Sequence, residues 1–61
     1  MLLTKLEDVL GKQLELMIGG HFFKGRIVEV DPASDTLVFT DDDGENYTID
    51  AGAVALYQLE K

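Results

Sequence analysis

The 61-residue sequence contains no cysteine and no tryptophan, and only one proline and one histidine. The absence of cysteine excludes disulfides, thiolate metal sites and a cysteine nucleophile. The single histidine, His21, cannot by itself supply the several ligands that a zinc site requires. A chain of this length buries only about 60% of the surface that its unfolded form exposes. Because disulfides and metals are missing as reinforcement, we expect the domain to be stabilised by oligomerisation.

Long apolar segments are missing as well. No run approaches the roughly 20 apolar residues of a membrane-spanning helix, and the first residues lack the basic and long apolar segments of a signal peptide. We therefore expect a cytoplasmic protein with no membrane partner. The hydrophobic fraction of 46% and the charged fraction of 28% are typical of a globular protein, and the length allows one domain over residues 1–61.

Basic residues are few. Five lysines and arginines stand against twelve aspartates and glutamates, which gives a net charge of −7. Nucleic-acid affinity comes largely from cations that neutralise phosphates, so this charge weakens a nucleic-acid interpretation. A locally basic patch can still exist on an acidic body. The simpler interpretation is that the acidity keeps the surface soluble.

Catalytic signals are absent too. The sequence offers no convincing nucleophile, base and orienting group, and a chain this small is expected to lack a pocket of the usual roughly 300–1,000 Å³. We therefore predict no enzymatic activity and no cofactor. The acidic segment 41–45 lacks the alternating oxygen ligands of an EF-hand, so we interpret it as a solvated turn and predict no metal site.

The N-terminal segment has a helical pattern. Thr4 and Glu7 fit a capping box, Leu6 and Val9 lie on one helical face, and Gly11 is typical of a helix end. These signals predict a helix over about residues 4–10.

After residue 11 the apolar period changes from helical spacing to alternation. Turn residues divide this part of the chain into five strands, predicted at about residues 12–18, 21–31, 36–41, 45–50 and 53–58. Gly19-Gly20 predicts a tight hairpin, and Gly25 predicts a bend inside the second strand. Alternation slips near Val28, which indicates a bulge. We expect a mainly β fold, a five-stranded antiparallel small barrel with a short N-terminal helix.

Alternation also predicts which side chains face inward. In the second strand we expect Phe23 to face the core and Phe22 to lie outside. In the fourth strand Tyr47 and Ile49 should face inward. In the last strand we expect Val54 and Leu56 to face inward, and an outward set that carries no charge: Ala53, Ala55 and Tyr57.

Several segments together resemble the first and second motifs of the Sm and Sm-like proteins, a family of small SH3-like barrels. They are GKQLEL at 11–16, FKGRIVEVD at 23–31 and LVF at 37–39, followed by YTI at 47–49 and AGAVAL at 51–56. The likeness covers nearly the whole chain, although its residues are mainly ones that form the fold and other SH3-like barrels share them.

The resemblance implies a homo-oligomeric ring in which the fourth strand of one subunit pairs with the fifth strand of the next. An uncharged edge strand is poorly protected against such pairing, which supports the same expectation on physical grounds. The predicted interface residues are Tyr47, Ala53, Ala55 and Tyr57.

Sm-like rings often bind single-stranded RNA, but this sequence departs from the RNA-binding pattern. The loop at 31–35 has no aromatic residue and no asparagine, and segment 50–52 has no arginine. Base stacking on an aromatic side chain is worth about 1–3 kcal/mol per base, and these segments contain no side chain that could provide it. We expect the usual uridine pocket to be missing, with its location lined by Ser34, Asp35, Ala51 and Gly52.

Aromatic and basic residues interleave between His21 and Arg26, which is the best local nucleic-acid signal in the chain. The candidate nucleic-acid residues are Phe22, Lys24, Arg26, Ser34, Asp35 and Gly52. Alternatively, Phe22 packs on the helix or a neighbouring subunit, and the basic side chains only decorate an exposed strand. Two hypotheses follow: an Sm-like ring that associates with RNA, or an acidic homo-oligomeric scaffold that binds protein partners and no nucleic acid.

Overall fold

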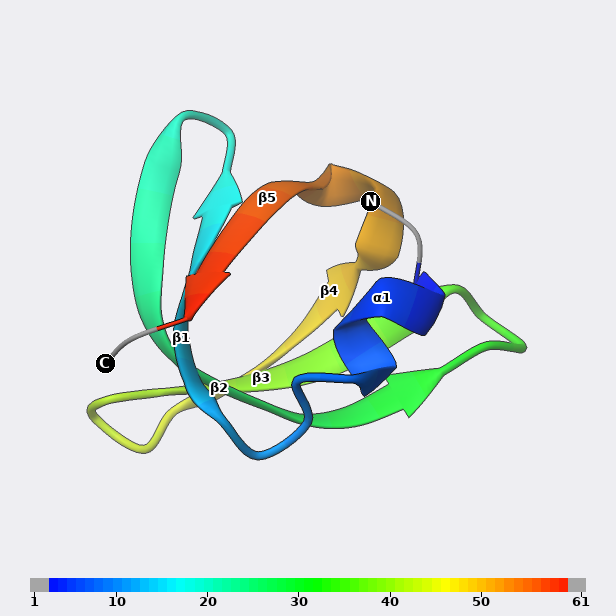
Figure 1. Ribbon diagram of the computed structural model, residues 1–61, viewed down its shortest axis with the longest axis horizontal. Helices are drawn as coiled ribbons and strands as arrows, with labels where there is room; N and C mark the ends of the chain where they lie inside the picture. Colours follow the sequence, from blue (N-terminus) through cyan, green and yellow to red (C-terminus); the bar gives the residue numbers. More distant parts are fainter. Residues whose placement is uncertain (1–2, 60–61) are drawn as a thin grey trace.

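A computed structural model describes residues 3–59, apart from the side chain of residue 4, as one short helix followed by five strands. The elements are shown in Figure 1: α1 (Leu3–Glu7), β1 (Gln13–Ile18), β2 (His21–Asp31), β3 (Thr36–Asp41), β4 (Asn46–Asp50), the 3₁₀ turn η1 (Ala51–Ala53) and β5 (Val54–Leu59). All five predicted strands are confirmed, and each boundary lies within one residue of its prediction.

The strands form a single antiparallel sheet in the order β4-β3-β2-β1-β5. Each consecutive pair from β1 to β4 is a neighbouring pair, and β5 returns to lie beside β1. The mainly β, antiparallel prediction is therefore confirmed. The sheet does not close on itself within the described residues, because β4 and β5 are its two outer strands.

Strand β2 bends so that it serves both halves of the sheet. Gly25 pairs with Leu14 of β1 on one side and with Asp41 of β3 on the other. A Cβ atom at this position would collide with the carbonyl oxygen of Thr40 and lie 2.9 Å from the ring of Phe39. Glycine is needed at this position because only a residue without a side chain allows β2 and β3 to approach this closely.

Two other predicted irregularities are confirmed. The pairing of β2 with β3 changes register between Ile27 and Glu29, which makes the region of Val28 a bulge. Gly19 and Gly20 have φ angles of 58° and 83°. Positive φ at both central residues gives the hairpin the twist that its flanking strands need.

The helix is shorter than predicted, since α1 ends at Glu7 rather than near residue 10. After it, the amides of Val9 and Leu10 donate to the carbonyls of Leu6 and Glu7, three residues earlier, at 3.2 and 3.4 Å. This spacing is a tight turn and not a continued α-helix. Gly11 has φ 77° as expected of a chain reversal, and its amide donates to the Ile27 carbonyl at 2.9 Å. The predicted capping box depends on the Thr4 side chain, which lies outside the described residues.

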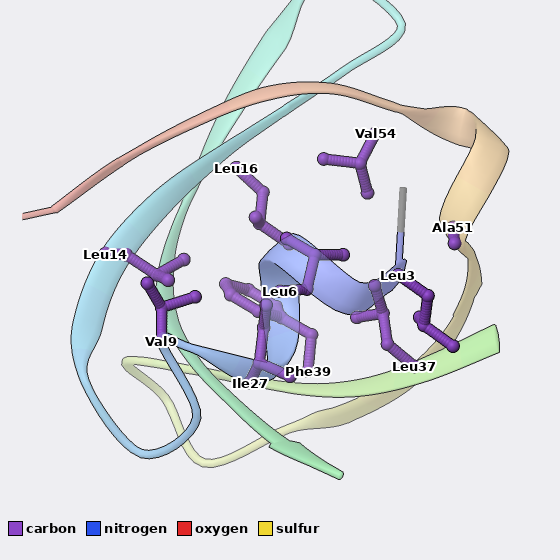
Figure 2. Close-up of a cluster of buried hydrophobic side chains, with 10 residues drawn as sticks. All are labelled: Leu3, Leu6, Val9, Leu14, Leu16, Ile27, Leu37, Phe39, Ala51 and Val54. Carbon is purple, nitrogen blue, oxygen red and sulfur yellow. The ribbon is translucent and has the colours of Figure 1, made fainter. Parts of the chain in front are cut away.

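The hydrophobic core lies between the helix and the inner face of the bent sheet. Figure 2 shows the helical side chain of Leu6 among residues from the strands. Leu6 has no exposed surface, because it is surrounded on all sides by apolar groups. The buried apolar residues are Leu3, Leu6, Val9, Leu14, Leu16, Ile27, Leu37, Phe39, Ala51 and Val54. A helix too short to hold alone is thus stabilised by covering the sheet.

Among residues 3–59, no helix has the length and apolar character needed to cross a lipid bilayer.

Candidate functional site

The β2–β3 loop and the β4–β5 turn meet at the location that the resemblance marked. The amide of Ala51 donates to the carbonyl of Asp35 at 2.9 Å, which brings Ser34 and Asp35 close to the turn that contains Gly52. Asp35 is the one non-glycine residue with positive φ in the described chain, at 56°. This conformation is uncommon outside glycine, although aspartate and asparagine adopt it more often than other residues, and it lets the loop reverse direction at its last residue.

Hydrogen bonds inside the β2–β3 loop fix its shape. One Asp31 carboxylate oxygen accepts from the Ala33 amide at 3.1 Å, and the other accepts from the Ser34 hydroxyl at 2.9 Å. The Ser34 oxygen also lies 2.7 Å from the hydroxyl oxygen of Thr36. The loop is therefore an Asx-type turn held by its own side chains, as its Asp-Pro-Ala-Ser-Asp sequence favours.

The charge of this loop pair is negative. Segments 31–35 and 50–53 contain three aspartates and no lysine or arginine. All three aspartates are exposed. Phosphate groups are attracted by cations, so this arrangement does not provide an electrostatic site for a nucleic-acid backbone.

The remaining nucleic-acid candidates lie elsewhere. Phe22, Lys24 and Arg26 alternate along β2 and point to its outer face, and all three are exposed. Lys24 lies directly opposite Glu15 of β1 in the strand pairing, a position at which opposite charges attract each other. These residues flank the β1–β2 hairpin, whereas Ser34 and Asp35 follow the opposite end of β2. The structure therefore brings the six predicted residues into two separate groups and not into one site.

An apolar cavity that sequence reasoning missed lies between the β1–β2 hairpin and the β3–β4 part of the sheet. It has a volume of about 210 Å³, and its lining residues are Ile18, Phe23, Phe39, Asp41, Tyr47 and Ile49. Phe23 and Tyr47 pair with buried Leu16 and Phe39, so both lie on the core-facing side of the sheet as predicted.

Neither aromatic side chain reaches the core. Phe23 is 45% exposed and Tyr47 is 49% exposed, so both lie on the predicted face of the sheet but neither is buried. In Figure 1 the tip of the β1–β2 hairpin stands away from α1, and none of the helices and strands formed by residues 3–59 lies over it there. Alternation gives the face on which a side chain lies but not whether anything covers that face. The sequence did contain a signal for the cavity, because two inward-facing aromatic residues, Phe23 and Tyr47, stand near the starts of their strands.

The carboxylate of Asp41 is the charged group of this cavity. One of its oxygens accepts from the backbone amides of Asp43 and Glu45, both at 2.9 Å, which shows why the 41–45 segment forms a turn. A hydrogen bond to Asp41 and its negative charge raise the pKa of Tyr47 above its ordinary value of 10.0. The charges of Glu45 and Asp43 act in the same direction. Three carboxylates thus contribute negative potential at one end of an apolar cavity.

The predicted interface residues lie on or next to the two outer strands. Tyr47 belongs to β4, Ala55 and Tyr57 belong to β5, and Ala53 ends the turn before β5. Ala53 and Ala55 are exposed, as predicted.

The inward and outward assignments within β5 are wrong for Leu56 and Tyr57. Tyr57 is half-buried against the core and Leu56 is 42% exposed, which reverses the prediction for both. The cause is a register shift: Met17 pairs with Leu56 and Ile18 pairs with Val54, so Ala55 is skipped. A bulge inserts one residue and therefore inverts the alternation that follows it.

Within the described residues, no group of three or more histidine, cysteine, aspartate or glutamate side chains is arranged to hold a metal ion. The acidic segment 41–45 uses Asp41 to bind backbone amides instead.

In comparisons with known proteins, the chain matches no protein-family model, no curated protein and no solved structure.

Proposed function

We propose that this chain is a self-assembling subunit of the Sm-like type, in which β4 of one copy pairs with β5 of the next copy until a ring closes. The observation that carries the proposal is the strand order, which leaves these two strands as the outer strands of one antiparallel sheet. An outer strand presents a row of backbone donors and acceptors along its free side, and a second copy can pair with it.

The side chains of the outer strands support pairing. Proteins usually protect an edge strand with charges, yet β5 has the sequence VALYQL and carries none. Exposed apolar groups lie on both outer strands: Leu56 and Leu59 on β5 are 42% and 44% exposed, and Tyr47 on β4 is 49% exposed. Pairing between copies would remove part of this apolar surface from water.

The pairing is head to tail, because each copy contributes one β4 and one β5. Contacts of this kind form rings when the rotation between copies closes. In such a ring the bent sheet of each copy forms a small barrel, and the neighbouring copies satisfy its two edges. The net charge of −7 opposes association, so added salt should strengthen the assembly by screening this repulsion.

Of the two hypotheses, the geometry favours an acidic scaffold over an RNA-binding ring. The loop pair at the location of the usual RNA pocket carries aspartates, and the basic candidates lie on a different part of the molecule with Glu15 opposite Lys24. A ring of such subunits presents repeated acidic loops, and these suit basic protein partners better than a polyanion.

Disulfide cross-linking can test the assembly directly, because the natural sequence has no cysteine. Thr48 on β4 and Gln58 on β5 are both exposed and lie on the outer face of the sheet. In the double variant Thr48→Cys/Gln58→Cys, oxidation should link successive copies into a ladder of covalent multimers that ends at one size. The introduced residues must come within about 4.4–6.8 Å between Cα atoms, which strand pairing provides for residues directly opposite each other. A second variant, Asn46→Cys/Gln58→Cys, tests a pairing between copies in which β4 is shifted by two residues.

A matched control places one cysteine on an inner strand. Val28 on β2 is 49% exposed but does not belong to an outer strand, so Thr48→Cys/Val28→Cys should form no ladder. If the β4/β5 variants gave only a monomer with an internal disulfide, the two strands would close on each other within one copy. That result would contradict the proposed assembly.

Nucleic-acid binding is tested separately by fluorescence polarisation with U-rich and A-rich oligonucleotides at low salt. The scaffold proposal predicts no salt-sensitive binding. Tight binding that weakens with salt and is lost on charge reversal at Lys24 and Arg26 would instead favour the RNA-associated ring.

A further inference from the structure

The cavity between the β1–β2 hairpin and strands β3 and β4 combines aromatic walls with one fixed carboxylate. Phe23, Phe39 and Tyr47 provide the aromatic groups, and Ile18 and Ile49 complete the apolar lining. Asp41 is the only charged residue among those that line it. Such a lining has a defined chemical preference, because aromatic rings attract cations through their electron-rich faces and a carboxylate attracts them by charge.

The carboxylate is held in place before any ligand arrives. One Asp41 oxygen accepts backbone hydrogen bonds from Asp43 and Glu45, each at 2.9 Å, so the side chain is fixed by the turn that follows β3. A group fixed in this way needs little reorganisation when it binds a cation. The side chains of Asp43 and Glu45 are exposed and add further negative charge near the site.

The size of the cavity restricts the ligand. Its volume of about 210 Å³ is smaller than the roughly 300–1,000 Å³ of pockets that hold whole drug-sized molecules, so it suits a single side chain. Apolar walls require the cation to lose water. The guanidinium group of arginine is more weakly hydrated than the lysine ammonium and stacks on aromatic rings, so arginine pays the smaller desolvation penalty.

We propose that this cavity binds an arginine side chain of a basic protein partner, with the guanidinium between Phe23 and Tyr47 and in contact with the carboxylate of Asp41. The net charge of −7 means that the rest of the surface also attracts a basic partner. The site shares Tyr47 and Ile49 of β4 with the proposed assembly, but Phe23, Phe39 and Asp41 lie on β2 and β3, which do not pair between copies, and no residue of β5 lines it.

The test uses ¹H–¹⁵N NMR titration of the intact chain with a short Gly/Ser peptide that contains one arginine. Two matched peptides replace the arginine with lysine or with citrulline, its neutral isostere. We expect the arginine peptide to shift the backbone signals of Phe23, Asp41, Tyr47 and Ile49, with affinity about tenfold above that of citrulline because charge-assisted contacts are the stronger ones. Lysine should lie between them. Equal binding of arginine and citrulline, no shifts with any peptide, or shifts confined to other residues would overturn the proposal.

Variants separate the site from the fold. Asp41→Asn keeps a side-chain oxygen for the Asp43 and Glu45 amides but removes the charge, and it should weaken arginine binding about tenfold. Phe23→Leu should weaken it several-fold while the assembly stays unchanged. Asp42→Asn removes a charge from the same loop outside the cavity lining and should have little effect. If Asp42→Asn and Asp41→Asn weakened binding equally, general acidity and not this cavity would be responsible. Sedimentation of the same samples reports the oligomeric state, so failure of the arginine site is distinguishable from failure of the assembly.

Discussion

Replacing Gly25 by alanine should strongly destabilise the fold. A Cβ atom there would collide with the Thr40 carbonyl oxygen and lie 2.8 Å from the Cα atom of Asp41. Both are backbone atoms of β3, so the paired strands themselves must shift and no flexible side chain can move away. Overpacking of a core typically costs about 1–3 kcal/mol, and a backbone collision belongs at the upper end of that range.

Another effect acts in the opposite direction. Alanine restricts the unfolded chain more than glycine does, which stabilises a fold by about 0.4–1 kcal/mol where the conformation is compatible. The collision is the larger effect, so we expect a net loss of roughly 2 kcal/mol. For a domain of this size, this loss corresponds to a fall in Tm of about 8–16 °C.

Thermal and urea unfolding followed by circular dichroism measures this loss, with all variants at one protein concentration because association contributes to stability. Gly52→Ala is the matched control. A Cβ atom at Gly52 would meet no heavy atom within 4 Å other than those of its chain neighbours, so the stability of this variant should change by less than about 0.5 kcal/mol. If Gly25→Ala were as stable as Gly52→Ala, the close approach of β2 and β3 at Gly25 would be wrong.

Three further predictions concern other parts of the fold. Leu6→Ala should lose about 2–5 kcal/mol because the side chain is fully buried, whereas Leu10→Ala, at a 41% exposed position, should lose far less in the same unfolding assay. Gly20→Val should lose about 1–2 kcal/mol because Gly20 has φ 83°, and unchanged stability would contradict this hairpin geometry. Because the pKa of Tyr47 is raised in the folded state, this residue stabilises the fold below pH 10.0, and its contribution to the free energy of unfolding is lost as pH rises through the folded pKa. Ultraviolet titration of a Tyr57→Phe variant should place the remaining tyrosine above its ordinary pKa, and Asp41→Asn should lower it.

The strands could be predicted from the sequence because their signals are local. Alternating leucines at 14 and 16, the Gly19-Gly20 pair and the aspartate-rich turns each act over a few residues. Even the bulge near Val28 was visible, because alternation slips within β2 itself. The end of α1 was less predictable, since Val9 and Leu10 continue a helical pattern that the chain leaves in order to pair Gly11 with Ile27.

Features that depend on a partner strand could not be predicted. The bulge in β5 arises from its pairing with β1, and nothing in the order Val54-Ala55-Leu56 indicates that Ala55 is skipped. The cavity has the same origin. Phe23 lies on the predicted face, but its exposure depends on how far the hairpin extends past the helix, which is a property of the tertiary structure.

Sedimentation velocity of the unmodified chain, from low to high micromolar concentration at several salt concentrations, tests the central claim most directly. We expect one closed oligomer, several times heavier than the 6.7 kDa chain, whose population rises with salt. A monomer at every concentration and salt would contradict it, because β4 and β5 would then remain unpaired between copies.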